Sequence, residues 1–376
     1  MKQAFIEADE QWFEHADDSG ADIGNAVRSA CRHWLQAAAK CETPADVWPD
    51  RVMRLYLEDN YGAREELLRS ANLLLGESAL RVLAGQFEAR MAKVLAGASN
   101  LPRLPHEVFH LSAALSLLSE ALGDPDVSVR AVLQYSPVPN ELQKQTFVQA
   151  YLDADRPEDA LPWLEGNWAD NEETREGLLA DTLERLGRFE ASEPVRRHML
   201  EEHPSVFHLR QWLQHLPEAN QADALARARQ MALGLSDPAT AASLLIEVGD
   251  IDSAEARLMA ESENLREKDF YALEVLAKAL RARERWRGET VIYRALLLDI
   301  LTRAYAKAYR HGARYWARLC EIAEFGAVLA PLRSHEDFAA EVRHRHGRKP
   351  AFWAQVDERR DGTAAAENGD GAFEFD

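Results

Sequence analysis

A similar phrase recurs along the middle of this chain, each time at the start of a helix-forming segment. Its copies begin at Asp155, Gly187, Glu218, Gly249 and Glu284, so successive copies lie roughly 31 to 35 residues apart. The segments before the phrases, such as TFVQAYLDA and TAASLLIEVG, carry Leu, Ala and Val at steps of three and four positions. That spacing is typical of helices packed on both sides. The chain therefore contains a series of helix pairs, none of which can bury its apolar surface alone.

This period is that of tetratricopeptide-type units. Ala, Leu, Glu and Arg are abundant, and alternating runs of Val, Ile and Thr are missing, so we expect an all-α fold. We predict a tetratricopeptide-like α-solenoid of stacked antiparallel helix hairpins. The predicted domains are an N-terminal helical region (1–97), connecting helices (98–140), the repeat array (141–330), C-terminal capping helices (331–356) and a disordered tail (357–376).

Composition indicates a protein of the reducing cytoplasm. No apolar run approaches the roughly 18 residues that a membrane-spanning helix needs. The first residues turn acidic at once and hold no apolar signal core, so we expect no secretion. Cys31, Cys41 and Cys320 are scattered, which fits free thiols better than a disulfide framework. We therefore expect a cytoplasmic protein that makes no membrane contact.

The charge of the chain is uneven. The net charge of −19 argues against general binding of nucleic acid. Between Lys278 and Arg318, however, eleven Lys and Arg residues face only three carboxylates, a local charge of +8 that leaves −27 for the remainder.

Five basic residues of this stretch follow one another at steps of three or four positions, and we predict that they form one continuous strip on a helix. They are Arg303, Lys307, Arg310, Arg314 and Arg318. As a binding site, the strip would suit an acidic peptide, an acidic protein face or a phosphate backbone. We favour the alternative, in which these side chains pair with carboxylates of neighbouring acidic repeats.

A second candidate motif lies near the C-terminus. It comprises His346, Arg348, Lys349, Phe352 and Trp353. We expect the two aromatic residues to cover the last apolar groove of the helix array. The alternative is that they form a hot spot that faces a partner protein.

His106-Glu107-Val108-Phe109-His110 matches the H-E-x-x-H pattern of zinc peptidases. That pattern places two imidazoles on one helix face, beside a glutamate that acts as general base. Here the motif follows Pro105 directly, so that His106 falls in the first turn of its helix. Neither a third histidine nor a well-placed carboxylate completes the ligand set. We therefore predict no metal and keep a zinc-dependent hydrolase only as an unfavoured alternative.

Several phrases resemble an uncharacterised bacterial family, catalogued as a domain of unknown function with tetratricopeptide-like helical repeats. They are FEHADDSGADIGNAVR (13–28), YLEDNYG (56–62), SEALGDPD (119–126), KAYRHGARYWARL (307–319) and SHEDFAAEVRHRHGRKPAFW (334–353). The resemblance implies a helical-repeat fold, a cytoplasmic setting and a further N-terminal segment in other members. It implies no activity, cofactor or catalytic residue.

We conclude that the sequence favours a non-catalytic protein-interaction scaffold or adaptor that needs no cofactor, with a protein partner. Nucleic-acid or anionic-ligand binding through residues 303–318 stays open as an alternative. So does a sensor domain that binds a small apolar ligand.

Overall fold

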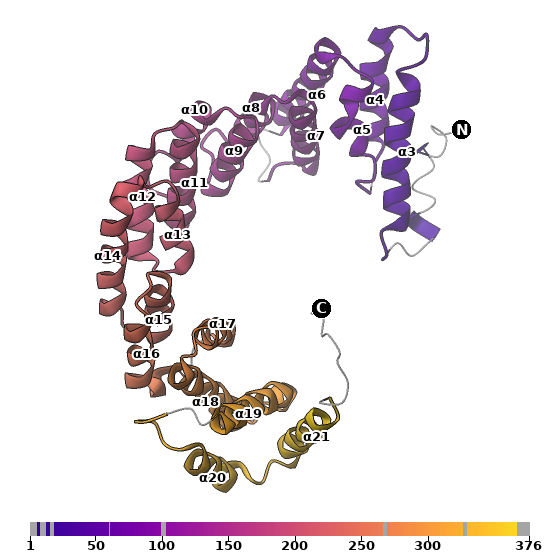
Figure 1. The fold of residues 1–376 in the computed structure, drawn as a ribbon. Helices are drawn as coiled ribbons and strands as arrows, with labels where there is room; N and C mark the ends of the chain where they lie inside the picture. The colour runs from indigo at the N-terminus through magenta and orange to yellow at the C-terminus, as the bar shows by residue number, and fades with distance from the viewer. Residues whose placement is uncertain are drawn as a thin grey trace. The chain divides into compact units, whose positions relative to one another are not determined.

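The structure is a computed structural model that describes residues 6–7, 13–15, 19–59, 61–98, 103–265, 269–325 and 329–366. Within these ranges every regular element is helical, as Figure 1 shows, which confirms the predicted all-α class. The chain divides into two compact units, Met1–Arg188 and Phe189–Asp376. This division falls inside the predicted repeat array, and the predicted domain boundaries stay predictions.

In the first unit, helices pack mainly on their neighbours along the chain: α6 on α7, α7 on α8, and α9 on α10 and η3. One apolar core lies beneath α3 to α8, and a smaller one surrounds Phe147 and Trp168. The elements are α3 (Asp22–Ala38), η1 (Ala45–Val47), α4 (Trp48–Leu57), α5 (Glu66–Arg69), η2 (Ala71–Leu73), α6 (Glu77–Gly97), α7 (His106–Leu122), α8 (Pro125–Tyr135), α9 (Glu141–Asp153), α10 (Pro157–Ala160), η3 (Leu161–Leu164) and α11 (Glu172–Arg185).

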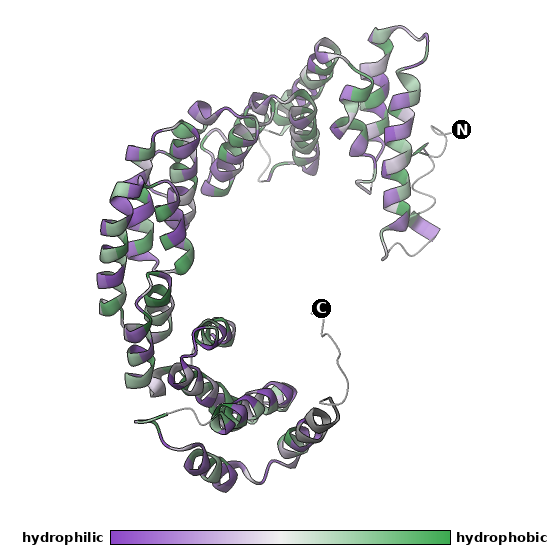
Figure 2. Cartoon of the chain, viewed as in Figure 1, coloured by the Kyte–Doolittle hydropathy of each residue, from purple (hydrophilic) through white to green (hydrophobic). Residues whose placement is uncertain are grey.

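The second unit has a single extended core, to which helices α12 to α21 contribute. Most helices pack on the next one along the chain, α15 and α16 contact α17 and α18, respectively, and α19 packs on α21. Hydrophobic and hydrophilic residues share most helices (Figure 2), as expected when one face is buried. The elements are α12 (Phe189–Glu202), α13 (Val206–Gln214), α14 (Glu218–Gly234), α15 (Pro238–Glu247), α16 (Ile251–Ala260), η4 (Ser262–Leu265), α17 (Phe270–Arg281), α18 (Trp286–Thr302), η5 (Ala306–Ala308), α19 (Tyr309–Glu324), α20 (His335–His346) and α21 (Pro350–Ala366).

The recurring phrase of the sequence corresponds to a recurring helix end. In each copy of this turn a residue with positive φ follows the helix, and the next N–H group donates to the carbonyl group five residues earlier. This is the Schellman C-cap, which reverses the chain while pairing carbonyl groups that the helix leaves open. The positive-φ residues are Gly123, Asp155, Gly187, Gly249, Glu284 and Ala304. Asp155, Gly187, Gly249 and Glu284 begin phrases seen in the sequence, and Gly123 marks an earlier copy of the turn.

The phrase at Glu218 lacks this turn. Pro217, with a φ of −53°, stands directly before α14. Because the proline ring holds φ negative, α13 cannot end through this residue in the left-handed region. Similar sequence segments therefore form two different kinds of helix connection.

The last helix extends further than the sequence indicates. Helix α21 continues to Ala366 and so includes the first ten residues of the predicted tail, 357–376. The prediction relied on missing periodicity and on the Gly, Ala and acidic content, but Ala and Glu are also good helix formers. Residues 367–376 of the predicted tail lie outside the described residues.

The recurring turn generates a paired prediction. Glu284 occupies the left-handed region at a φ of 57°, which disfavours residues that carry a Cβ atom. We expect Glu284→Gly to raise the free energy of unfolding by about 0.5–1 kcal/mol. This is the net effect, after subtraction of the stabilisation that the unfolded chain gains from the greater conformational entropy of glycine. Gly249→Ala, at a φ of 86°, should lower it by about 1 kcal/mol. Chemical denaturation checks both, and equal signs for the two variants would contradict the interpretation.

The contact between α19 and α21 generates a second prediction. A Cβ atom on Gly312 would lie 3.2 Å from Cε2 of Phe352 and 3.5 Å from Cδ1 of Leu297. We expect Gly312→Val to destabilise the chain by about 1–3 kcal/mol through overpacking. Gly85→Val is the matched control, because Gly85 is an exposed helical glycine with no atom near the added group. Thermal denaturation followed by circular dichroism should show a loss only for the first variant.

Candidate functional site

The predicted basic strip is not one continuous helix. Helix α18 ends at Thr302, Arg303 is its C-cap residue, and Lys307 lies in the short helix η5. The remaining three arginines of the strip are on α19. The prediction of one helix is wrong because Ala304 adopts a φ of 53° and reverses the chain. No glycine or proline marks this turn in the sequence.

Two of the predicted arginines line a pocket in the second unit. Its volume is about 330 Å³, and side chains of α17, α18, α19 and α21 surround it. The lining residues are Glu274, Lys278, Arg281, Tyr293, Arg314, Tyr315, Ala317, Arg318, Glu321 and Arg359. Five cationic side chains thus face two carboxylates. The other strip residues (Arg303, Lys307 and Arg310) are exposed and are not among the lining residues.

One wall of the pocket is organised by Glu274 of α17. Its Oε1 atom accepts hydrogen bonds from the guanidinium of Arg314 and from the hydroxyl of Tyr315. The Tyr315 ring stacks on Tyr293 with ring centroids 5.4 Å apart and planes 22° apart. Burial, followed by the hydrogen bond to Glu274, raises the pKa of Tyr315, so that its hydroxyl remains a donor. The carboxylate therefore connects α17 with α19.

The lining residue Arg318 of α19 forms a buried ion pair with Glu289 of α18, which is not itself among the lining residues. Arg318 is 6% exposed and Glu289 is fully buried. Two hydrogen bonds join them, from Nε to Oε1 at 2.7 Å and from Nη2 to Oε2 at 3.2 Å. The Nη1 atom also bonds Oε2 of Glu321 at 2.8 Å. Burial by itself would lower the pKa of Arg318, but these hydrogen bonds outweigh it and the pKa is raised. Arg318 is therefore a permanent cation at this position.

The charge of the pocket favours an anionic group. Five cations and two carboxylates in the lining leave a surplus of three positive charges, and the buried Glu289 beneath them reduces the surplus to two. The rest of the chain is strongly acidic, so this is a local reversal of sign. Low-dielectric walls focus such a field and raise the local concentration of a small anion.

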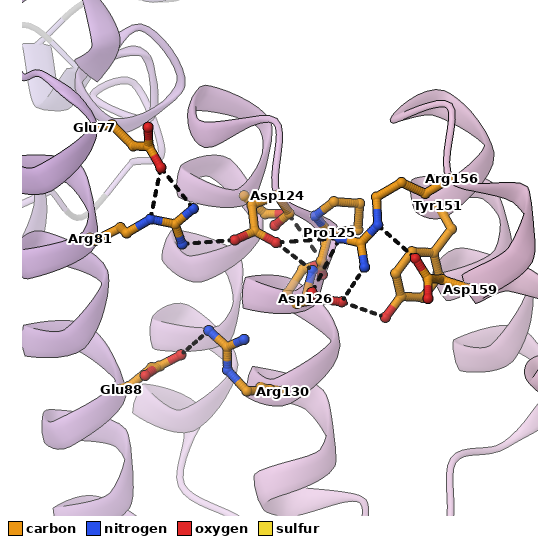
Figure 3. A network of polar contacts seen from close by, with 12 residues as sticks. Glu77, Arg81, Glu88, Asp124, Pro125, Asp126, Arg130, Tyr151, Arg156 and Asp159 are labelled. Carbon is orange, nitrogen blue, oxygen red and sulfur yellow. Dashed lines mark hydrogen bonds and ion pairs between the residues drawn. The ribbon is translucent and has the colours of Figure 1, made fainter.

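A polar network in the first unit provides a useful contrast. As Figure 3 shows, Arg81 bridges Glu77 on its own helix and Asp124 before α8, with Nη1 of Arg81 2.9 Å from Oδ2 of Asp124. Further along, Arg156 contacts Asp126 and Asp159 at 3.1 and 2.7 Å. In this network carboxylates outnumber guanidinium groups. It ties α6, α8, α9 and α10 together and leaves no positive surplus for an anion.

The C-terminal motif packs against α19 outside the pocket. Phe352 is fully buried in an edge-to-face contact with Tyr309, at 5.8 Å between ring centroids. Trp353 meets Trp316 at 5.2 Å and donates from Nε1 to the carbonyl of His346 at 3.1 Å. Arg348 is exposed and Lys349 is half-buried; both lie in the connection between α20 and α21. Whether the motif also contacts a partner stays a prediction.

The H-E-x-x-H residues have structural contacts of their own. His106 is the first residue of α7, in the first turn as predicted. Glu107 is paired with Arg90 at 2.7 Å. His110 stacks on Tyr56 at 4.8 Å between ring centroids, and its burial lowers its pKa. In the part of the chain that the structure describes, no group of three or more His, Cys, Asp or Glu side chains is placed to hold a metal ion.

The fold and the pocket define an all-helical protein with a cationic recess in its second unit. The sequence matches the family of unknown function DUF6880 over residues 3–355, and the chain therefore belongs to this family. The resemblance to an uncharacterised domain-of-unknown-function family is thereby confirmed. No curated protein and no solved structure matches the chain. Among the helices of the described ranges, none has the length and apolar content to cross a membrane.

The pocket contains several residues that the sequence did not single out. Glu274, Tyr293 and Arg359 carry no local motif, and Arg359 falls in the predicted tail. Lys278 and Arg281 belong to the basic stretch but not to the predicted strip. The one available signal was the spacing of Glu274, Lys278 and Arg281 at steps of four and three, which places them on one helix face.

The buried ion pair generates a prediction about stability. Arg318→Met leaves the Glu289 carboxylate buried without its partner, so we expect a loss of about 3–5 kcal/mol. The double variant Glu289→Leu/Arg318→Met should recover most of that loss, because it removes both charges. Chemical denaturation followed by tryptophan fluorescence measures both. Additive effects of the two substitutions would contradict the pairing.

Proposed function

We propose that this protein is a non-catalytic helical-repeat scaffold or adaptor of the bacterial cytoplasm, and that it binds a partner protein through the pocket between α17 and α19. We further propose that its hairpins stack as a tetratricopeptide-like solenoid. The recurring Schellman turns support the second proposal, as do the contacts of α15 and α16 with the helices next but one along the chain. Such stacking gives long surfaces that bind extended segments.

The observation that carries the binding proposal is the surplus of positive charge in the pocket. Its lining contains five cationic side chains and two carboxylates. The net charge of this lining is therefore +3, in a chain whose net charge is −19. A local field of that sign favours an anionic group of a partner protein.

Nucleic-acid binding is the second candidate, and the geometry favours it less. A phosphate backbone needs a long row of cations, whereas the turn at Ala304 separates Arg303 from Lys307, and both lie outside the pocket lining. The contacts of His110 and Glu107 favour structural roles over zinc-dependent hydrolysis. Binding of a small apolar ligand has no specific observation in its favour.

Affinity capture from the source cells tests the proposed function. Lys278→Glu reverses a charge inside the pocket, and Lys307→Glu reverses one predicted strip residue that lies outside it. We expect a specific partner to be recovered with the wild type and with Lys307→Glu, and to fall about tenfold with Lys278→Glu because the pocket attraction is lost. Quantitative mass spectrometry of the captured proteins gives the ratios.

The two variants must keep the melting temperature of the wild type for the comparison to be valid, which their exposed positions favour. A partner lost with Lys307→Glu but retained with Lys278→Glu would assign binding to the predicted strip instead of the pocket. Recovery of nucleic acid, with an affinity that falls steeply as salt rises, would replace the proposal by the second candidate.

A further inference from the structure

Helix α17 carries exposed apolar side chains on the side that faces away from the core. Its buried residues are Leu273, Leu276, Ala277 and Leu280. We call Phe270, Tyr271 and Val275 the α17 strip; their exposed fractions are 47%, 69% and 67%. At about 100° per residue, Tyr271 and Val275 lie opposite the buried face, where a surface helix normally carries polar residues. Large apolar side chains that gather at such a place are typical of a contact surface.

The α17 strip and the pocket lie on the same helix. Tyr271, Val275 and Lys278 follow at steps of four and three, so they share one face, and Lys278 belongs to the pocket lining. The helical rise places the first and last of them about 10 Å apart. A short segment of chain can therefore contact the α17 strip and the pocket at the same time.

Residues 367–376 of the chain itself, with the sequence ENGDGAFEFD, have a composition that fits this surface. They contain four carboxylates and no Lys or Arg, so their side chains carry a charge of −4, opposite in sign to the +3 of the pocket lining. Such net charges attract whether or not each cation of the lining also has a partner within the chain, because the field sums over all charges. The segment also contains Phe373 and Phe375. In an extended chain alternate residues face the same side, so both rings can contact the α17 strip together.

The connection to α21 brings this segment within reach. Arg359 of α21 is a lining residue, and α21 ends at Ala366, about 10 Å further along the helix axis. The seven residues from Ala366 to Phe373 span up to about 23 Å when extended. A return of about 10 Å to the pocket and a further 10 Å or so to the α17 strip need about 20 Å. The segment is therefore long enough whatever the direction of the last turns of α21.

We propose that residues 367–376 bind to the α17 strip and the pocket of their own chain. Phe373 and Phe375 pack on the strip, and the carboxylates of the segment lie beside the pocket lining. Covalent attachment favours this occupant over a free peptide, because a short tether gives an effective concentration on the order of 1 mM. The docking itself does not depend on the proposed function. Its consequence, that the segment competes with the partner protein for the pocket, rests on that function.

Disulfide trapping tests the docking in the full chain. Cys41→Ser removes the exposed thiol, and Val275→Cys with Ala372→Cys then places one thiol on the α17 strip and one on the segment, next to its phenylalanines. Val82→Cys with Ala372→Cys is the matched control, because Val82 is an exposed valine of helix α6. After mild oxidation, peptide mass spectrometry should find the intramolecular disulfide about tenfold more often in the first variant. Equal yields from the two variants would overturn the inference.

A fluorescein-labelled peptide of residues 367–376 gives the second measurement. By anisotropy it should bind the full chain carrying Phe373→Ser and Phe375→Ser about tenfold more tightly than the wild type, whose own segment occupies the surface. Adding Val275→Ser to that variant should weaken peptide binding about fivefold, since it removes apolar contact, whereas adding Val82→Ser should leave it unchanged. Equal affinity for the variant and the wild type, or undiminished binding of a peptide with Ser in place of both phenylalanines, would contradict the proposal.

The docking and the proposed function can fail separately. If the segment competes for the pocket, affinity capture with the Phe373→Ser/Phe375→Ser variant should recover severalfold more of the partner than capture with the wild type. A partner captured without any trapped disulfide or peptide binding would leave the proposed function intact and show that the docking is wrong. Docking without a captured partner would support the inference and contradict the proposed function.

Discussion

Glu289 is the group on which the geometry of the second unit depends. A fully buried carboxylate is costly unless it is paired and hydrogen-bonded, and the fork of Arg318 provides both contacts from the next helix. A second buried carboxylate belongs to Glu255 of α16, which is 3% exposed. It accepts from Arg287 at 2.8 Å and from the N–H group of Gly288 at 3.1 Å. Buried carboxylates thus set how α16, α18 and α19 are rotated against each other.

That rotation creates the pocket. With Arg318 directed toward α18, the residues three and four positions before it in α19, Tyr315 and Arg314, face α17 and meet Glu274. Gly288 allows the close approach of α17 and α18, since a Cβ atom there would lie 3.0 Å from Cδ1 of Leu280. The recess is therefore a consequence of packing and charge pairing together.

The sequence predicts the helix pairs well and their exact ends less well. Gly187 and Gly249 are visible as turn residues because glycine adopts positive φ at low cost. Glu284 is recognised only by its place in the repeat. Ala304 is neither a glycine nor a member of the repeat. The sequence therefore gives no sign of the turn that interrupts the predicted strip. A left-handed residue that is not Gly, Asn or Asp is held by the packing of the helices around it, which a local pattern does not contain.

The site is predictable to the same degree. Arg314 and Arg318 stand out from the sequence by charge and spacing, whereas their partners Glu274 and Glu289 lie 40 and 29 residues away. Helix-surface pairing rules reach only four positions along the chain, so they cannot identify these contacts. Arg359 was not predicted for another reason. The composition around it resembles that of a disordered tail, whereas the residue belongs to helix α21, which places it at the pocket.

The two polar clusters of this protein show what separates a structural role from a candidate binding site. Both are built of arginines and carboxylates on neighbouring helices. In the network around Arg81 and Arg156 the carboxylates are in excess, so every guanidinium is satisfied within the chain. In the lining of the pocket five cationic side chains outnumber two carboxylates. The same side-chain chemistry therefore gives the two clusters opposite net charges, and only the second cluster has the sign that favours an anion.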